Sequence, residues 1–216
     1  MYYIITENIT PNQYGFMPDS TTVDCFVDLV EEISTTLDRG DYAVTIFLDL
    51  SKAFDTANHS ILFSKLKYYG INPITWFTSY FHNRKQRVFV NGIFSDTLQI
   101  SSREPQGSIL GPLLFLLYIN DFTQASKMFS MRLYADVDTS LTVSGKNIDD
   151  LLYQINVELP NIHDWLCANK LTLSLKKTIS CFSALSKIKF SFIASVNFSR
   201  RNLGESIQYK IPRNCY

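Results

Sequence analysis

Three aspartates stand where predicted β-structure ends, and their spacing favours metal-dependent chemistry. Asp49 closes an apolar, β-rich run, while Asp136 and Asp138 lie at the tip of a predicted hairpin with apolar residues on both sides. Like charges this close repel each other, so a bound cation is a natural reason to keep them. Hard divalent ions such as Mg²⁺ bind a few carboxylate oxygens together with substrate phosphates. Two such ions can activate an attacking hydroxyl and stabilise a leaving phosphate.

A loop rich in glycine and proline, residues 103–112, adds a second chemical feature. Its composition predicts a rigid turn into a helix N-terminus, where backbone amides and the Gln106 side chain could contact a flat or anionic ligand. Each feature also has an ordinary explanation: many strands end in a capping aspartate, acidic turns are common, and this loop is also typical of a plain strand-to-helix turn. Only the combination points to phosphoryl transfer.

The predicted elements supply the framework that must position these residues. Apolar residues recur at helical spacing in five segments and alternate or cluster as in strands in five others. We expect helices over 23–37, 60–69, 73–81, 109–122 and 147–166, and strands over 42–50, 86–91, 97–101, 131–135 and 139–143. Pro160 should kink or split the last helix. This order predicts an α+β fold in which helices back an antiparallel sheet.

Composition excludes several classes of protein. The 20 basic and 20 acidic residues give zero net charge, unlike most complete nucleic-acid enzymes, although an acidic catalytic part needs no basic excess. The four cysteines are scattered without CxxC spacing, which argues against a thiolate metal site or a disulfide framework. The N-terminus does not resemble a signal peptide, and the longest apolar run, 109–119, is too short to span a bilayer. We therefore expect an intracellular protein, cytoplasmic or nuclear, with no membrane contact.

Several linked motifs resemble the reverse transcriptase domain of non-LTR (LINE-type) retrotransposons. The resemblance rests on FLDLSKAFD at 47–55, PQGSILGPLLFLLYIND at 105–121 and the LYAD box followed by Asp138. QYGF with STT at 13–22 and the blocks at 76–92 and 164–178 extend it, so that it covers roughly residues 10–185. It implies an RNA-directed DNA polymerase, in which a primer 3′-hydroxyl attacks the α-phosphate of a dNTP on an RNA template. The wording of the motifs favours this family over maturase-type reverse transcriptases.

The resemblance also implies roles for individual residues. Asp49 and Asp136 correspond to the aspartates that hold two Mg²⁺ ions, and Asp138 stands for the last acid of the YADD box. Phe54 resembles the aromatic gate that selects deoxynucleotides. The remaining nucleotide- or template-binding positions that it implies are Lys52, Pro105, Gln106, Gly107 and Lys177. Lys177 resembles a proton donor to pyrophosphate, although beside Lys176 it can equally be part of a solvated charge pair.

The resemblance predicts a polymerase palm, an antiparallel sheet backed by helices, with partial fingers and no recognisable thumb. We divide the chain into a partial fingers segment, 1–40, the palm, 41–182, and a divergent tail, 183–216. The expected partners are an RNA template, a DNA primer and dNTPs, without a stable protein partner. One departure from the family matters most, because Val137 separates two acids that are adjacent in YADD. The alternative function is therefore a catalytically inactive remnant, or a weak nucleic-acid-binding fragment.

Overall fold

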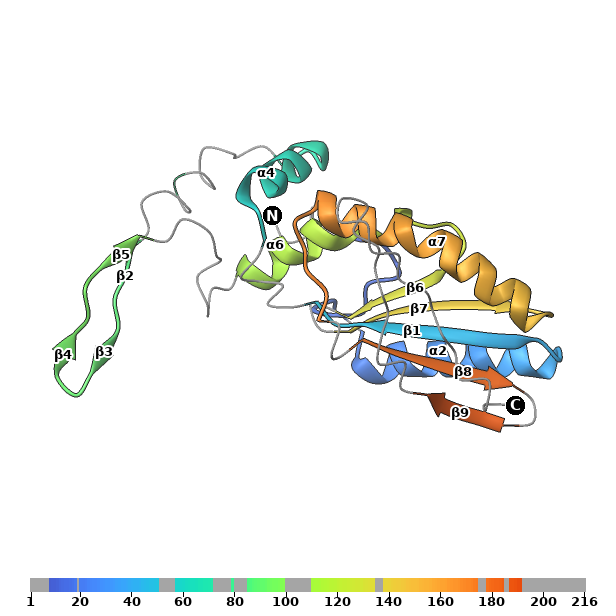
Figure 1. Ribbon diagram of the computed structural model, residues 1–216. Helices are drawn as coiled ribbons and strands as arrows, with labels where there is room; N and C mark the ends of the chain where they lie inside the picture. The colour runs from blue at the N-terminus through green and yellow to red at the C-terminus, as the bar shows by residue number, and fades with distance from the viewer. Residues whose placement is uncertain are drawn as a thin grey trace, which may run out of the picture.

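A five-stranded antiparallel sheet forms the centre of the computed structural model, in the order β6-β7-β1-β8-β9 (Figure 1). The structure describes residues 8–18, 20–50, 57–71, 79, 85–99, 110–134, 138–174, 178–184 and 187–191. The sheet strands are β1 (Tyr42–Leu48), β6 (Ser130–Tyr134), β7 (Asp138–Gly145), β8 (Ile179–Ala184) and β9 (Lys187–Ser191). The helices are α2 (Thr22–Asp38), α4 (His59–Tyr68), α6 (Leu110–Ile119) and α7 (Ile148–Ala168), with a 3₁₀ turn at Asn120–Gln124.

The strand β1 lies at the middle of the sheet. It pairs with β7 from Tyr42↔Gly145 to Leu48↔Thr139, and with β8 on its other side. Its side chains are buried almost without interruption, which explains why its sequence is a continuous apolar run rather than an alternating one. The strand predicted over 42–50 is confirmed, as is the mixed architecture of helices and an antiparallel sheet.

Helices cover both faces of this sheet (Figure 1). On one side α7 packs against β7 and α4 packs against α6; on the other side α2 contacts β1, β6 and β8. The buried residues of α7 recur at helical spacing, as an amphipathic helix on a sheet requires. They are Leu151, Ile155, Leu159, Ile162 and Leu166. None of the described helices combines the length and the apolar character that a membrane span would need.

Pro160 does not divide α7. The helix is one element from Ile148 to Ala168, so the expected split is not found. Proline removes one backbone hydrogen bond from a helix interior. The buried stripe continues on both sides of Pro160, from Leu159 to Ile162, and this packing offsets the loss.

The domain boundaries predicted from the sequence do not follow the sheet. The prediction assigns α2 to a fingers segment, yet α2 packs on the sheet itself. The boundary at residue 182 falls inside β8, and β9 continues the sheet through the segment predicted to be a divergent tail. The sequence of β9, KIKFS, alternates basic and apolar residues, a strand pattern that the prediction overlooked.

Residues 85–99 form a separate hairpin, which we call the hairpin arm. Two short antiparallel pairs build it: β2 (Lys85–Gln86) with β5 (Leu98–Gln99), and β3 (Phe89–Val90) with β4 (Ile93–Phe94). Asn91 and Gly92 have φ of 50° and 83°, as the predicted Asn-Gly turn requires. The paired segments are shorter than the strands predicted over 86–91 and 97–101. The helix predicted over 73–81 falls almost entirely outside the described residues.

Candidate catalytic site

Asp49 is the first residue after the central strand β1, and its side chain is partly buried. The chain that follows α7 returns to this point. The N–H of Ser174 donates to the Asp49 carbonyl at 2.8 Å, and Leu50 forms an isolated bridge with Leu173. Asp49 therefore lies where the end of β1 meets the chain that follows α7, at one end of the sheet.

The register of the sheet relates Asp49 to the predicted acidic hairpin. The last pair between β1 and β7 is Leu48↔Thr139, so the next positions along the two strands are 49 and 138. Residues directly opposite each other in such a ladder are about 5 Å apart. Asp138 also pairs with Tyr134 across the β6–β7 hairpin. The backbones of Asp49 and Asp138 thus lie at the same end of neighbouring strands.

Most of the other predicted site residues lie outside the described part of the chain. These are Lys52, Phe54, Pro105, Gln106, Gly107, Asp136 and Lys177, and of Asp138 only the backbone is described. Residues on either side of Lys177 are described, however. Ser174 contacts Asp49, and Thr178 donates its N–H to the Ser174 carbonyl at 3.0 Å. The chain on both sides of Lys177 is therefore held close to Asp49.

The residues described at this end of the sheet fit a magnesium site in part. Asp49 offers hard carboxylate oxygens at a strand end, which is the donor type that Mg²⁺ prefers. Among the described residues, no three histidine, cysteine, aspartate or glutamate side chains come together as a metal site. Asp136, the second expected ligand, belongs to the residues that are not described.

Tyr118 of α6 connects the helices behind the site. It is completely buried, and its hydroxyl donates to the carbonyl of Asn169 at the end of α7 at 2.5 Å. The same hydroxyl accepts the N–H of Asn58, the N-cap of α4, at 3.3 Å. One phenol therefore ties together the start of α4 and the ends of α6 and α7. Burial, the largest effect, raises its pKa.

Lys65 reinforces this junction from α4. Its ammonium donates to the Tyr118 carbonyl and to the Asp121 carboxylate, both at 2.6 Å, and lies 4.8 Å from the centre of the Trp165 ring. Burial lowers the pKa of Lys65, against the opposing effect of Asp121. A largely buried cation with a carboxylate and an aromatic face as partners fixes the packing of α4 on the other helices.

A second ionic cluster anchors α2 to the edge strand β6. Arg132 is buried, and its guanidinium contacts Asp28 and Glu32 of α2, each at 2.6 Å. The hydroxyl of Tyr14 donates to Asp28 at 2.8 Å, and burial together with this bond raises the pKa of Tyr14 to about 12. The segment containing Gln13 runs beside β6 and forms a parallel bridge with Leu133. The QYGF segment is thereby fixed next to the strand that leads into the acidic box.

Sequence reasoning did not identify these supporting residues. Tyr118 and Asp121 lie within the PQGSILGPLLFLLYIND block, so the motif marks their positions. The motif alone assigns no role to either residue. Lys65 and Arg132 carried no such signal. Their partners are far away in the chain, and only the fold brings them together.

Comparison with known proteins agrees with this architecture. A family model described as "Reverse transcriptase (RNA-dependent DNA polymerase)" matches residues 2–198. The chain belongs to the reverse transcriptase family. The match covers β1, α6 and the β6–β7 hairpin, which are the elements that carry the predicted motifs.

Relatives within this family come from Drosophila melanogaster transposons. The chain is 35% identical over 125 residues to the probable RNA-directed DNA polymerase from transposon X-element, covering 55% of this chain and 13% of that protein. It is 30% identical over 196 residues to the one from transposon BS, covering 83% of this chain and 21% of that protein. This reverse transcriptase chain thus spans about a fifth or less of these relatives.

One solved structure to which the chain shows a likeness is that of telomerase from Candida albicans in complex with a TWJ fragment of telomeric RNA. The likeness has a TM-score of 0.47 and 15% sequence identity, over 80% of this chain and 32% of that one. The assignment to the reverse transcriptase family rests instead on the family match and on the transposon relatives.

Proposed function

We propose that this domain synthesises DNA on an RNA template, adding dNTPs to the 3′-hydroxyl of a primer. Membership of the reverse transcriptase family supports the reaction class, and the relatives are themselves named RNA-directed DNA polymerases. The observation that carries the proposal is the strand register, which sets Asp49 across from the start of β7 at one end of the sheet. Polymerase chemistry needs carboxylates from two chain segments at one point.

In this proposal Asp49 and Asp136 hold two Mg²⁺ ions, with Asp138 next to them. When bound, the ions supply Lewis-acid stabilisation of the attacking and leaving oxygens. Phe54 would exclude a ribose 2′-hydroxyl. The positions proposed to bind template and nucleotide are Lys52, Pro105, Gln106, Gly107 and Lys177. The chain on either side of Lys177 lies close to Asp49, which supports a role for Lys177 next to the triphosphate.

A specific observation favours the alternative, an inactive remnant. Three residues separate the paired positions Tyr134 and Asp138, and one of them is Val137, which divides the two acids of the family's YADD box. An additional residue at a hairpin tip changes the face of the sheet to which the flanking side chains point, unless a bulge absorbs it. Loss of catalysis would leave a protein of the same fold without the activity.

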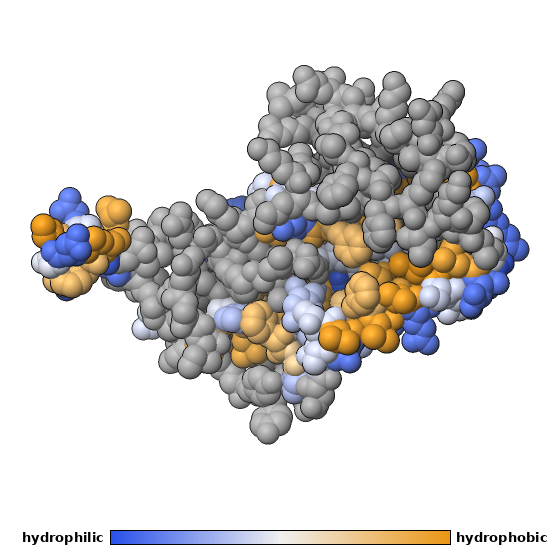
Figure 2. Space-filling model, turned by 90° about the horizontal axis from the view of Figure 1, so that it is seen from below, coloured by the Kyte–Doolittle hydropathy of each residue, from blue (hydrophilic) through white to orange (hydrophobic). Residues whose placement is uncertain are grey.

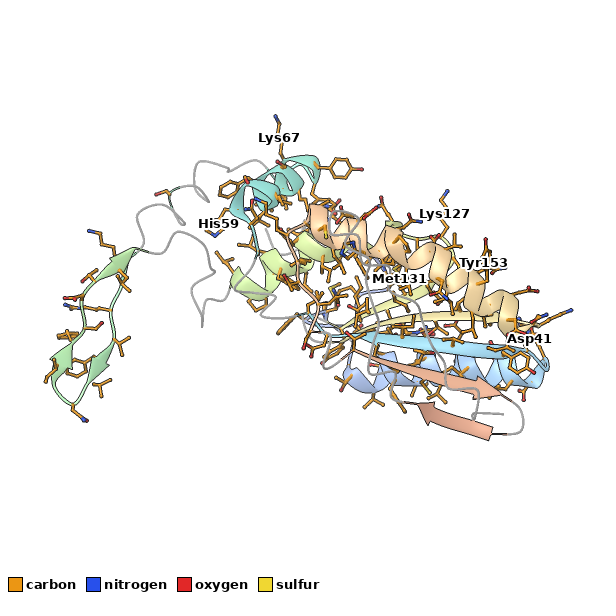
Figure 3. The ribbon with its side chains drawn as sticks, viewed as in Figure 1. Asp41, His59, Lys67, Lys127, Met131 and Tyr153 are labelled. Atoms are coloured by element: carbon orange, nitrogen blue, oxygen red, sulfur yellow. The ribbon has the colours of Figure 1, made fainter. Side chains whose placement is uncertain are left out.

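Primer extension tests both functions. The purified chain, an RNA template annealed to a DNA primer, dNTPs and Mg²⁺ should yield extended primer, and Asp49→Asn should reduce the rate about 100-fold or more. The matched control is Asp41→Asn, which removes a carboxylate at the other end of β1 (Figure 3) and should leave the rate unchanged. Extension that survives Asp49→Asn would contradict the proposed site. A folded wild-type chain that extends nothing would favour the remnant.

A further inference from the structure

Exposed apolar side chains gather in two places on the described part of the chain. Fourteen large apolar residues are exposed there, and ten of them belong to α2 or to the hairpin arm. The ten are Val23, Phe26, Val27 and Val30 on α2, and Val88, Phe89, Val90, Ile93, Phe94 and Leu98 on the arm. Clusters of this kind, unlike scattered apolar residues, mark sites of protein contact.

The α2 cluster is a continuous stripe along one side of the helix. Val23, Phe26, Val27 and Val30 follow helical spacing and are 43% to 65% exposed, whereas Leu29, on a different side, is buried. Figure 2, seen from below, shows apolar surface gathered in the region of α2. We call this surface the α2 stripe. It faces away from the sheet, and such a face fits a second apolar element.

Acidic residues border the α2 stripe. The helix carries five carboxylates and no lysine or arginine: Asp24, Asp28, Glu31, Glu32 and Asp38. Asp28 and Glu32 contact Arg132, while the other three are exposed and stand seven residues apart, along one edge of the stripe. Two copies meeting stripe to stripe would bring like charges together. A partner for this face must be apolar and basic.

The hairpin arm has these complementary properties. By strand alternation, Lys85, Arg87 and Phe89 share one face. On this face Phe94 lies across from Phe89, and the centre of its ring is 3.8 Å from the Arg87 guanidinium. The arm contains Lys85 and Arg87 against a single acid, Asp96, and so has a net charge of +1. A two-stranded hairpin is at best marginally stable in water, so the arm gains most from an apolar surface that covers it.

We propose that the hairpin arm of one copy packs on the α2 stripe of a second copy. The face that carries Phe89 and Phe94 would meet Phe26, Val27 and Val30, with Lys85 and Arg87 beside the acidic edge. The reciprocal contact, from the second arm to the first α2, closes a symmetric dimer. Figure 1 shows the arm extending away from the sheet on which α2 lies, so the contact joins two molecules.

Nucleic acid fits these surfaces less well. The carboxylates along α2 repel phosphates, and four of the six exposed apolar residues of the arm are aliphatic, so they cannot stack on bases. The complementary charges of the arm and α2 therefore favour a protein partner, and the second copy carries both halves.

Sedimentation velocity of the full chain over a range of concentrations tests the contact with a charge swap. One variant carries Glu31→Lys and Asp38→Lys on α2; the other carries Lys85→Glu and Arg87→Glu on the arm. Each alone opposes like charges at both contacts, so its dimer dissociation constant should rise about tenfold or more. An equal mixture restores opposite charges at both contacts and should dimerise about as tightly as wild type.

Further variants keep the test independent of any effect on folding. Val27→Glu in the α2 stripe should also weaken the dimer, whereas Val157→Glu, at an exposed apolar residue of α7, should not. Far-ultraviolet circular dichroism verifies that each variant is folded. A wild-type chain that stays monomeric at every concentration would overturn the proposal. So would swapped variants that dimerise like wild type, or whose mixture stays monomeric.

Discussion

Arg132 shows at the scale of one residue how the sheet holds its outer helix. A buried guanidinium is costly to desolvate, and two carboxylates of α2 compensate for it. Both carboxylates remain partly exposed, so solvent screens the pairs and their net contribution is smaller than that of a fully buried pair. The cluster orients α2 more than it adds to stability.

This cluster predicts how stability depends on pH. Burial favours the protonated form of Asp28, but the hydrogen bonds from Arg132 and Tyr14 prevail and lower its pKa below the ordinary value. The pKa of Asp28 is thus lower in the folded state than in the unfolded state, where it is near 4. The ionised carboxylate therefore stabilises the folded protein above about pH 4, and this stabilisation is lost as the pH falls towards the folded-state pKa. The free energy of unfolding should therefore decrease less between about pH 5 and pH 2 in Asp28→Asn than in wild type.

Urea denaturation at each pH measures this difference. The control is Asp38→Asn, which removes an exposed carboxylate from the same helix that makes no salt bridge within the described residues. Equal acid dependence in wild type and Asp28→Asn would contradict the assigned cause.

At the scale of single residues, the sequence predicted the position of a candidate catalytic residue better than that of the residues that hold the helices together. Asp49 follows a run whose apolar character is visible without any structure, so its place at a strand end could be predicted. Lys65 looks like an ordinary surface lysine on a helix. Its burial against Asp121 and Trp165 depends on contacts at least 50 residues away in the chain, which no local pattern encodes.

The β6–β7 hairpin carries Val137, the residue that the motif resemblance predicts to be an insertion between two acids. Tyr134 and Asp138 pair, and β7 keeps seven consecutive pairs with β1 on its other side. Because both strands hold their register, the additional residue lies in the three-residue connection between them. Two-residue connections match the twist of paired strands best. Deleting Val137 leaves such a connection and makes the two acids adjacent.

We therefore expect the Val137 deletion to extend primers about tenfold faster or more than the wild-type chain, measured as initial rates at saturating Mg²⁺. Val137→Ala keeps the length of the connection and should leave the rate at the wild-type level. No gain upon deletion would mean that the inserted valine is not what limits catalysis.

Elements with strong periodicity were predicted well, and the failures have physical causes. The helix predicted over 23–37 corresponds to α2, whose start is fixed by a capping box between Thr21 and Asp24. The split considered for Pro160 does not occur, because tertiary packing on both sides outweighs one lost hydrogen bond. β8 and β9 went unrecognised, because short strands depend on partners that are distant in sequence.

The charge of the whole molecule limits how it can hold nucleic acid. With 20 basic and 20 acidic residues, the chain neutralises few phosphates when it binds, and each neutralised phosphate steepens the dependence on salt. The logarithm of its affinity for a primed RNA template should fall against the logarithm of the salt concentration with a slope no steeper than about −3. Fluorescence anisotropy between 50 and 200 mM salt measures this. A slope of about −6 or steeper would reveal a basic binding surface.

The order of strands in the sheet has a consequence for how the molecule is made. The central strand β1 pairs only with β7 and β8, so its first partner emerges from the ribosome about 90 residues later. At usual rates of synthesis that is a wait of about 5 to 20 s. During this interval one of the most apolar segments of the chain has no strand to pair with. We therefore expect slower translation between β1 and β7 to lengthen the time for which this strand is exposed to aggregation.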